Sequence, residues 1–346
     1  MDTPTSDMPP SDMVCPTPQE SPPCPVCGNE TFTPVFQGAR DYIWRKPGRF
    51  TLARCTRCTL VITRPRPTPE GIGFYYENAY SGEAQAGMKR FQTESAIGKL
   101  IARYRLRVIH KVRSLTAQDR VLDVGCSYGG FLRVAREVTG CETSGIDLDA
   151  DSIKDAVDTD QTDYKIGRLE EVGYPDERFS VITFFQSLEH THQPVDALAA
   201  ARKALEPGGL CVVEVPDFNG VWRRVFRTAW LPLLIPQHLS HFTPKSLRAA
   251  FEAAGFTAIK HRQSMFYPFE GVASLGIWLG RVLKSPPPGS PPSWRTPFDL
   301  LILLILMVLY VVVEIPSQAI MQLLGVTGHQ IMIAQKPPAD SSAPEA

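Results

Sequence analysis

The sequence carries no excess of charge of either sign, because 36 lysine and arginine residues balance 36 aspartate and glutamate residues over 346 positions. A general nucleic-acid binder needs a basic surface that neutralises phosphates, so this balance argues against that class. The amino terminus also lacks the charged-then-apolar pattern of a secretory signal. Residues 1–22 are instead rich in proline, serine and aspartate, and we expect a disordered arm on a protein that faces the cytosol.

A dinucleotide-binding turn is also missing its central glycine. In Val121-Leu-Asp-Val-Gly-Cys-Ser-Tyr-Gly-Gly130, Ser127 stands where the middle glycine of G-x-G-x-x-G would approach a pyrophosphate. Gly125 and Gly129 are nevertheless present, and they allow the backbone a close approach to a ligand that a Cβ atom would push away. The stretch therefore predicts a strand, a glycine-rich turn and a helix that bind a different adenosine-containing cofactor.

Two carboxylates narrow the choice of cofactor. Asp147 ends the second strand of Gly145-Ile-Asp-Leu-Asp149, where it is placed to accept hydrogen bonds from ribose hydroxyls. Asp123 lies two residues before the first glycine of the turn, where it would repel a diphosphate and attract a sulfonium or an ammonium group. Both residues favour S-adenosylmethionine over NAD.

Later segments complete a recognisable order of motifs. Phe179-Ser-Val-Ile-Thr-Phe-Phe185 has the continuous apolar character of a buried strand, Gln186-Ser-Leu-Glu-His190 follows it, and Leu210-Cys-Val-Val-Glu-Val215 is the next strand. With these pieces the chain resembles the class I S-adenosylmethionine-dependent methyltransferases over about Gln118 to Arg262. Ser180 departs from the aspartate that is usual there. The cofactor-binding positions that the residues and this resemblance imply are Asp123, Gly125, Ser127, Gly129, Asp147, Leu148, Leu169, Glu170 and Gln186.

The resemblance implies an α/β fold, a Rossmann-like seven-stranded sheet with helices on both faces whose last two strands form an antiparallel hairpin. A small zinc ribbon is expected before it and an apolar helical insertion before the last strand. The expected units are the arm (1–22), a zinc-ribbon-like module (23–68), a helical linker or lid (69–117), the cofactor domain (118–267 and 328–337), the insertion (268–327) and a disordered tail (338–346).

Four of the eight cysteines form two C-x-x-C turns, Cys24-Pro-Val-Cys27 and Cys55-Thr-Arg-Cys58. Four thiolates satisfy the tetrahedral preference of Zn²⁺, and strand-like pieces between the turns suit a zinc ribbon. A cytosolic setting disfavours disulfides. We therefore expect a structural zinc ion on Cys24, Cys27, Cys55 and Cys58, with no open position for catalysis. No cysteine is placed by a motif to act as a nucleophile.

Histidines after the fourth and fifth strands are the candidates for a general base, since imidazole titrates near neutrality. His238 and His241 are the first choices, and His190, close to where the sulfonium should lie, is the alternative. A metal site from Glu189, His190 and His192 is disfavoured, because their loop lacks helical spacing. The reaction expected is in-line attack of the acceptor on the methyl group.

The acceptor is expected to be a small molecule that is glycan-related or lipid-linked, methylated on oxygen or carbon. Arg64-Pro-Arg-Pro67 and the aromatic stretch Phe74 to Tyr80 resemble an arrangement found in methyltransferases with such a ribbon that act on sugars. Tyr75, Tyr76 and Tyr80 are expected either to cover the cofactor or to pack against the ribbon. Basic residues between Arg103 and Arg113 are read either as a solvated helix face or as an attraction to a membrane or a phosphorylated acceptor.

The gap between the sixth strand, which ends near Gln263, and the last strand, Gln330-Ile-Met-Ile-Ala-Gln335, exceeds the ~12–15 residues of an ordinary loop. It contains the uninterrupted apolar run Leu300 to Val313. As a helix this run would cover about 21 Å, short of the ~30 Å hydrocarbon core. The flanking strands join one sheet, so a single crossing is excluded. A re-entrant or two-helix hairpin with Gly271 to Gly280 as its partner stays open. We favour a peripheral position at the inner face of the membrane, with a homodimer contact or a buried helix as the soluble alternative. In the favoured position the headgroups would be faced by Arg281, Lys284 and Arg295, with Trp278 and Trp294 at the boundary.

A second class of function is a non-catalytic scaffold, either a cofactor-binding protein or a zinc adaptor recruited to a membrane. Asp123, Gly125 and Asp147 favour the enzyme, because a scaffold does not need them together. Methylation of nucleic-acid bases is disfavoured by the neutral charge and by the lack of the Asn-Pro-Pro-aromatic and Pro-Cys signatures of base-modifying enzymes.

Overall fold

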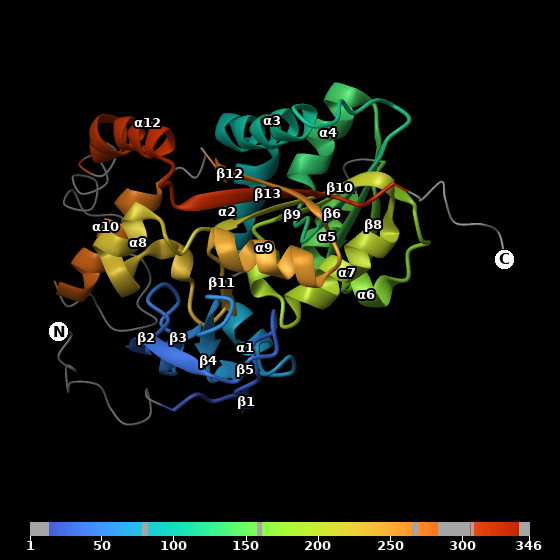
Figure 1. Ribbon diagram of the computed structural model, residues 1–346. Coiled ribbons are helices and arrows are strands. Elements are labelled where there is room, and N and C mark those ends of the chain that lie inside the picture. The colour runs from blue at the N-terminus through green and yellow to red at the C-terminus, as the bar shows by residue number, and fades with distance from the viewer. Residues whose placement is uncertain are drawn as a thin grey trace.

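The computed structural model describes residues 14–77, 82–157, 161–264, 269–282, 305 and 308–338. Its centre is a seven-stranded sheet in the order β12-β13-β10-β9-β6-β7-β8 (Figure 1). All pairs among β6 to β10 are parallel, and β13 is antiparallel to both of its neighbours. The strands are β6 (Arg120–Val124), β7 (Glu142–Asp147), β8 (Asp163–Ile166), β9 (Phe179–Phe185), β10 (Leu205–Pro216), β12 (Ala258–Ser264) and β13 (His329–Gln335).

The expected Rossmann-like sheet and its terminal antiparallel hairpin are confirmed. Every residue of β9 is buried, as expected for a strand covered on both faces. The hairpin pairs Ala258 with Gln335 and Ser264 with His329, although a long insertion separates the two strands in sequence. The insertion therefore leaves the sheet and returns to it at the same edge.

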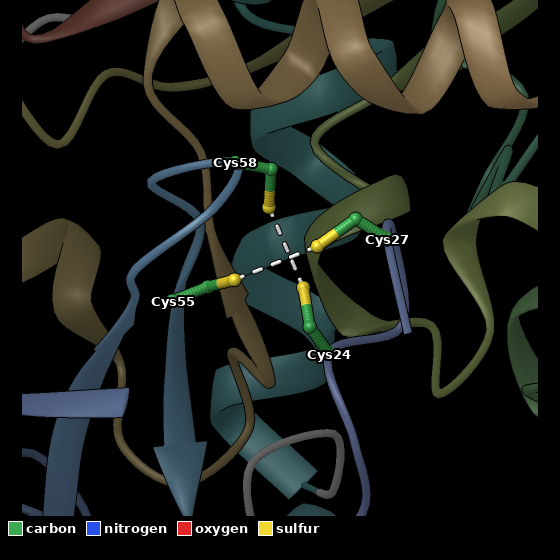
Figure 2. Close-up of side chains that lie close together, drawn as sticks. All are labelled: Cys24, Cys27, Cys55 and Cys58. Carbon is green, nitrogen blue, oxygen red and sulfur yellow. Dashed lines mark hydrogen bonds between the residues drawn. The ribbon is translucent and has the colours of Figure 1, made fainter. Parts of the chain in front are cut away.

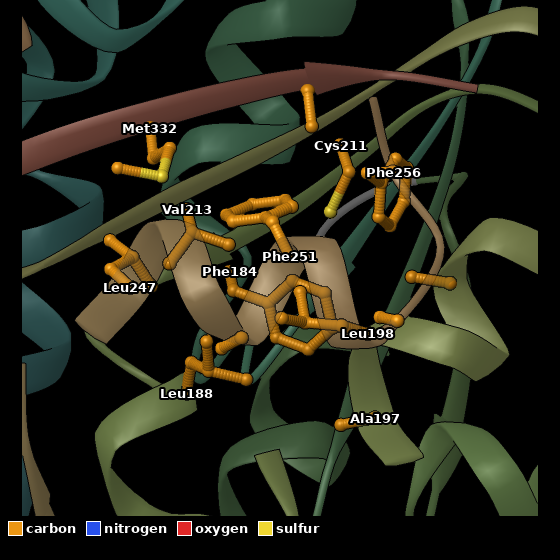
Figure 3. Close-up of a cluster of buried hydrophobic side chains, with 14 of the residues drawn as sticks. Phe184, Leu188, Ala197, Leu198, Cys211, Val213, Leu247, Phe251, Phe256 and Met332 are labelled. Atoms are coloured by element: carbon orange, nitrogen blue, oxygen red, sulfur yellow. The ribbon is translucent and has the colours of Figure 1, made fainter. Parts of the chain in front are cut away.

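Helices cover the sheet on both faces and bury two separate apolar clusters. One face carries α3 (Ala96–His110), α4 (Gly130–Thr139) and α5 (Ala150–Val157), whose apolar side chains meet alternate residues of the central strands. The other face carries α6 (Leu169–Val172), α7 (Pro194–Ala204) and α9 (Pro244–Ala253). Figure 3 shows the second cluster, in which Phe184 and Phe251 pack between the sheet and these helices.

Local sequence explains where α9 begins and ends. The Thr243 side chain accepts a hydrogen bond from the Ser246 backbone amide, the Ser246 side chain accepts one from the Thr243 backbone amide, and Pro244 occupies the first helical position. Gly255, with φ of +85°, follows the last turn. This helix fixes the segment that precedes it, which includes His238 and His241.

The N-terminal part forms a second sheet, of four strands, in the order β11-β4-β3-β2. Three strands come from the expected ribbon, β2 (Phe32–Ala39), β3 (Phe50–Cys55) and β4 (Val61–Arg64). The fourth, β11 (Ser240–His241), comes from the segment after the fifth strand of the large sheet and pairs with β4. The ribbon is thus joined by backbone hydrogen bonds to the other domain, which the sequence does not indicate.

The expectation of a disordered arm over residues 1–22 does not hold for residues 14–22. There β1 (Gln19–Glu20) pairs with β5 (Arg66–Pro67). The physical reason is Arg66, which is 1% exposed and donates from Nε to the Glu20 carboxylate at 2.7 Å. A buried guanidinium requires such a partner. Residues 1–13 and 339–346 lie outside the described residues.

The linker after the ribbon is helical, with α1 (Gly73–Tyr76) and α2 (Gly82–Thr93) before α3. Tyr75 has no exposed surface, and its hydroxyl donates to the Pro47 carbonyl oxygen at 2.8 Å, so this ring packs against the ribbon rather than covering a ligand. Tyr76 lies elsewhere, with its hydroxyl 2.7 Å from Nδ1 of His190. Tyr80 lies outside the described residues.

The segment after β10 and the insertion pack together. The segment contains α8 (Val221–Phe226) and the short 3-10 turns η3 (Arg227–Ala229) and η4 (Leu231–Leu233), and the insertion contains α10 (Glu270–Val282), the π-helical turn η5 (Tyr310–Glu314) and α12 (Ile315–Leu324). The Glu314 carboxylate accepts hydrogen bonds from the first amides of α10, at Gly271 (3.0 Å) and Val272 (2.9 Å). It thereby satisfies donors that a helix start leaves open.

Among the described residues no helix is both long and apolar enough to cross a membrane. Of the expected apolar run, only residues 305 and 308–313 are described, and Val311 to Val313 are exposed there. Lys284 and Arg295, expected to face the headgroups, and Trp294, expected at the boundary, lie outside the described residues, and nothing is described of the Arg281 side chain. Trp278, the other residue expected at the boundary, is 45% exposed.

Candidate functional site

The turn after β6 has the geometry expected of a cofactor-binding bend. Gly125 has φ of +80°, and a Cβ atom there would collide with the side chain of Ser187. Gly129 has φ of +69° and is the N-cap of α4, where a Cβ atom would collide with the Tyr164 hydroxyl. Both positions require glycine, so the bend can adopt this shape only with the residues that the sequence supplies.

Asp147 lies at the carboxyl end of β7, beside this bend. One carboxylate oxygen accepts a hydrogen bond from the Ser127 amide at 2.8 Å, and the other accepts from the Asp149 amide at 3.0 Å. Burial raises the pKa of Asp147 above its ordinary value, while these amide donors oppose the rise. Each oxygen keeps a further lone pair, so the carboxylate can still accept from ribose hydroxyls.

Asp123 is buried at the end of β6, with 4% of its surface exposed. Its Oδ1 accepts a hydrogen bond from the Thr183 hydroxyl at 2.6 Å. Burial raises the pKa of Asp123 to about 6, against the lowering effects of Thr183 and Arg105. A carboxylate held in this way gains from a nearby cation, as expected for a residue that faces an ammonium or sulfonium group.

The remaining expected cofactor positions differ in exposure. Leu148 is 65% exposed and Glu170 is exposed, whereas Leu169 is buried. Gln186 follows β9, and its backbone amide donates to the Glu214 carbonyl at 2.8 Å. Within the described part of the chain, the Ser127 hydroxyl and the Gln186 side-chain nitrogen are buried without a hydrogen-bond partner. Unpaired buried polar atoms beside the bend fit a polar ligand.

Two hydrogen bonds connect the glycine bend after β6 with the segments that carry His190 and His238. The Ser187 hydroxyl donates to the Val124 carbonyl at 2.5 Å, and the 3-10 turn η2 (Leu188–His190) begins at the next residue. The Leu239 amide donates to the Glu189 carbonyl at 3.0 Å and so holds the segment with His238 against η2. The rim formed by the carboxyl ends of the central strands, where the acceptor was expected, therefore carries side chains from two distant parts of the sequence; we call this rim the acceptor edge.

His190, His238 and Glu189 lie together at this edge. The rings of His190 and His238 meet edge to face, with centroids 4.5 Å apart, and His238 Nε2 lies 3.9 Å from Glu189 Oε1. Burial lowers the pKa of His190 to about 4 and lowers that of His238 well below 6.5. Burial raises the pKa of Glu189 to about 8. Without a further ligand, all three groups are neutral at pH 7.

His241, also expected as a base, lies in β11, and its Nε2 is 3.2 Å from the Thr63 hydroxyl of the ribbon. Burial lowers its pKa to about 3, so it is a weak proton acceptor. His192, which was not expected to form a metal site with Glu189 and His190, has its Nε2 3.1 Å from the Pro67 carbonyl. Tertiary folding brings His238 to Glu189 instead.

Two residues of this edge were not singled out from the sequence in these roles. Glu189 is only 1% exposed, and Tyr76 contacts His190 from α1. The one available signal is the acidic residue directly before His190, in the loop that follows β9. Nothing in the sequence indicates that residues 76, 189 and 238 meet, because their contacts join three separate elements.

The four cysteines of the ribbon converge from two turns (Figure 2). Cys24 Sγ lies 3.4 Å from Cys58 Sγ, and Cys27 Sγ lies 3.5 Å from Cys55 Sγ, so the sulfurs are not disulfide-bonded. Sulfurs around a tetrahedral Zn²⁺ are separated by about 3.8 Å, given Zn–S distances of ~2.3 Å. The hydrogen bond between Cys24 and Cys58 lowers the pKa of Cys24 and raises the pKa of Cys58, because the two sulfurs share one proton. The donor set fits a structural zinc ion.

A separate cavity of about 510 Å³ opens between α3, β12 and α12. Among the described residues, its lining includes three cations, Arg107, Lys111 and Arg262, and no acidic residue. Arg105 of α3 is paired with Glu214, and Arg113, which follows this helix, is paired with Asp119 and Glu206. Within the basic stretch, Arg105 and Arg113 are ion-paired, whereas Arg103, Arg107 and Lys111 are exposed, and the last two of these line the cavity.

Comparison with known proteins agrees with this geometry. A family model described as a methyltransferase domain matches residues 90–261. The ubiquinone biosynthesis O-methyltransferase of Idiomarina loihiensis is 30% identical over 164 residues, which covers 44% of this chain and 67% of the relative. The protein of the same name from Ruegeria sp. is 26% identical over 160 residues, covering 43% of this chain and 64% of the relative. The chain thus spans about two thirds of the length of these relatives.

Among solved structures, Haemonchus contortus phosphoethanolamine N-methyltransferase 2, in complex with phosphomonomethylethanolamine and S-adenosylhomocysteine, matches with a TM-score of 0.51 and 12% identity. The match covers 81% of this chain and 63% of that one. At this identity the likeness shows the fold alone.

Proposed function

Since the chain belongs to the family of S-adenosylmethionine-dependent methyltransferases, we propose that it methylates a hydroxyl of a small lipid-linked acceptor. The cofactor supplies an electrophilic methyl group when bound. Asp147 would hold the ribose hydroxyls, Gly125 and Gly129 would leave room for the methionine part, and Asp123 would attract its ammonium group. These assignments are supported by the left-handed glycines and by the buried carboxylates beside them.

The observation that carries the choice of acceptor is the joint position of a basic cavity and an apolar surface. Gln322 of α12 lines the cavity with Arg107, Lys111 and Arg262. On the same helix, Leu323 is 87% exposed and Leu324 is 69% exposed. A surface of this kind suits a molecule with a phosphate or other anionic group and an apolar tail, and it suits the inner face of a membrane that contains anionic lipids.

The relatives add support for an acceptor of this type, because their names connect them with ubiquinone biosynthesis and O-methylation. A lipid-linked sugar belongs to the same proposed class. For this chain, oxygen is the favoured methyl acceptor, since neutral imidazoles line the edge where the acceptor should lie.

The proposed reaction is a single displacement. The acceptor oxygen attacks the methyl carbon in line with the carbon–sulfur bond, that bond breaks, and S-adenosylhomocysteine leaves as a neutral thioether. The hydroxyl proton departs at the edge formed by Glu189, His190 and His238. Most of the rate gain would come from the positioning of the two reactants.

The test is a search for methylated products in cells that contain the intact protein or its Asp147→Ala form. Lipid and glycan extracts are analysed separately for species that gain one methylene unit. A product that appears in the lipid fraction only with the intact protein supports the proposal. A product confined to the glycan fraction, or the same products with both forms, contradicts it.

A further inference from the structure

We infer that Glu189, His190 and His238 bind a divalent transition-metal ion at the acceptor edge, separate from the cysteine site. One ligand atom of each side chain lies within 4.8 Å of the others. Two imidazoles and one carboxylate are a donor set that Zn²⁺ and similar ions prefer over Mg²⁺, and this set leaves positions open for another ligand.

Glu189 provides an independent observation. It is 1% exposed, and neither of its carboxylate oxygens has a hydrogen-bond partner among the described residues. A buried carboxyl without a partner is costly, and native structures almost always satisfy such groups. The positive charge of Arg105 interacts with Glu189, but the Arg105 guanidinium forms its ion pair with Glu214, at 2.6 Å. A cation between Glu189 and His238 would satisfy this carboxylate.

The imidazole of His238 is oriented as a metal ligand. Its Nδ1 lies 2.8 Å from the Pro232 carbonyl, which can only accept, so Nδ1 carries the proton. The Nε2 lone pair then points into the group, 3.9 Å from Glu189 Oε1. A backbone carbonyl that fixes the far nitrogen in this way is typical of metal-bound histidine.

His190 is held from the other side. Its Nδ1 lies 2.7 Å from the Tyr76 hydroxyl and 3.2 Å from the Gln237 carbonyl. Ligand atoms bonded at ~2.0–2.2 Å around one ion are separated by about 3.4 Å in a tetrahedral site, so the three atoms would close by roughly one ångström. Small side-chain rotations achieve such a change.

The consequence for the reaction deepens the proposed function and rests on it. The acceptor oxygen would occupy an open position on the ion, which lowers the pKa of the hydroxyl. The hydroxyl proton passes to solvent, and the oxygen keeps the electron pair that attacks the methyl carbon. A neighbouring hydroxyl, or other donor, on the acceptor could take a second open position.

The experiment measures metal content and affinity in the full-length chain. The protein is loaded with Zn²⁺ or Co²⁺, freed of excess ion and analysed by elemental mass spectrometry, with calorimetry for affinity. We expect two ions per chain. Glu189→Gln and His238→Gln should each retain one ion and lose at least tenfold in affinity at the second site. His192→Gln is the matched control, because His192 lies in the same loop but outside the group, and it should retain two.

Cobalt distinguishes the two sites, since the cysteine site gives intense thiolate-to-cobalt charge-transfer bands and the second site does not. One ion per chain in the intact protein, or two ions in Glu189→Gln, would overturn the inference. If His238→Gln fails to fold, the metal content of the isosteric variant Glu189→Gln tests the second site alone. Binding of S-adenosylmethionine is measured in parallel: its absence in a chain that still holds the second ion contradicts the proposed function and leaves the metal site standing.

Discussion

At the scale of single residues, Asp147 is expected to contribute most to cofactor affinity. Asp147→Ala should weaken S-adenosylmethionine binding by about 1–3 kcal/mol, the effect of losing hydrogen bonds to a charged group. Calorimetry measures this change. Glu171→Ala, an exposed acid on α6, is the control and should bind normally. Equal affinity for Asp147→Ala and the intact protein would remove Asp147 from the site.

Asp123 should make cofactor binding depend on pH. Its raised pKa of about 6 means that it is ionised at pH 7 and protonated at pH 5 in the free protein. If the cationic cofactor needs the carboxylate, affinity is constant above pH 6 and falls by up to about tenfold for each pH unit below it. Calorimetry at pH 5 and 7 should therefore show a dissociation constant about tenfold higher at pH 5.

The control for this pH effect is Asp123→Asn, which should bind weakly at both pH values. A pH dependence that survives in Asp123→Asn would assign the effect to another group. In the cofactor-free domain, the contribution of Asp123 to folding stability changes with pH in the opposite direction to cofactor affinity. Because the folded-state pKa lies above 3.8, the unfolded chain releases this proton first, so the contribution of Asp123 to stability falls as pH rises from 3.8 to about 6.

Some of these residues can be placed from the sequence and others cannot, because local geometry fixes the first group and long-range contacts fix the second. Gly125 and Asp147 are set by local geometry, a bend directly after one strand and a carboxylate at the end of the next, and both occupy the expected places. Glu189 depends on contacts with a segment about 50 residues away, which no local pattern encodes. His241 is of the right type but is held by Thr63, a residue of another domain.

At the level of helices and strands, the pairing of β11 with β4 connects the cysteine-bearing ribbon with the segment that carries His238. The sequence predicts the ribbon strands well, since their apolar residues lie between two C-x-x-C turns. It does not predict that residues 240–241 extend the ribbon sheet, because two-residue strands carry no periodicity. In the same way, the strands that flank the insertion can be predicted from the sequence, whereas the hydrogen bonds from the first amides of α10 to Glu314 cannot.

Removal of the metal from the cysteine site should therefore impair catalysis more than cofactor binding. In Cys27→Ser the ribbon loses a ligand and β4 loosens, which disturbs His241 and the neighbouring His238. We expect the thermal midpoint to fall by more than about 5 °C and methyl transfer to fall at least tenfold, with cofactor affinity changed by less than about threefold. Thermal melting, an activity assay and calorimetry measure these quantities.

Cys15→Ser serves as the control for this experiment, because Cys15 lies outside the cysteine site and a serine can keep its contact with the Tyr75 hydroxyl. Full activity of Cys27→Ser with the ribbon unfolded would show that the ribbon does not support the acceptor edge.

At the scale of the whole molecule, the cationic cavity and the exposed side chains of α12 should produce binding to anionic vesicles. Each cation near such a surface contributes about 1 kcal/mol, so Arg107→Glu together with Lys111→Glu should weaken partitioning at least tenfold. Leu323→Ser with Leu324→Ser should weaken it independently of salt. Sedimentation with vesicles that contain phosphatidylglycerol measures both effects.

The control is Lys203→Glu, on the opposite face of the large sheet in α7, where the side chain is 72% exposed. This variant should partition like the intact protein. Two results would show that the cationic cavity and α12 do not bind membranes. One is that the intact protein does not sediment with anionic vesicles; the other is that Lys203→Glu loses as much binding as the cavity variants.

Cofactor binding at the glycine bend is tested most directly by a crystal structure of the full chain with S-adenosylhomocysteine. We expect the nucleoside to lie against Gly125 and Gly129, with its ribose hydroxyls on Asp147 and its amino-acid part close to Asp123. Density for the nucleoside elsewhere, or a bend that stays filled by the surrounding side chains at saturating ligand, would contradict it.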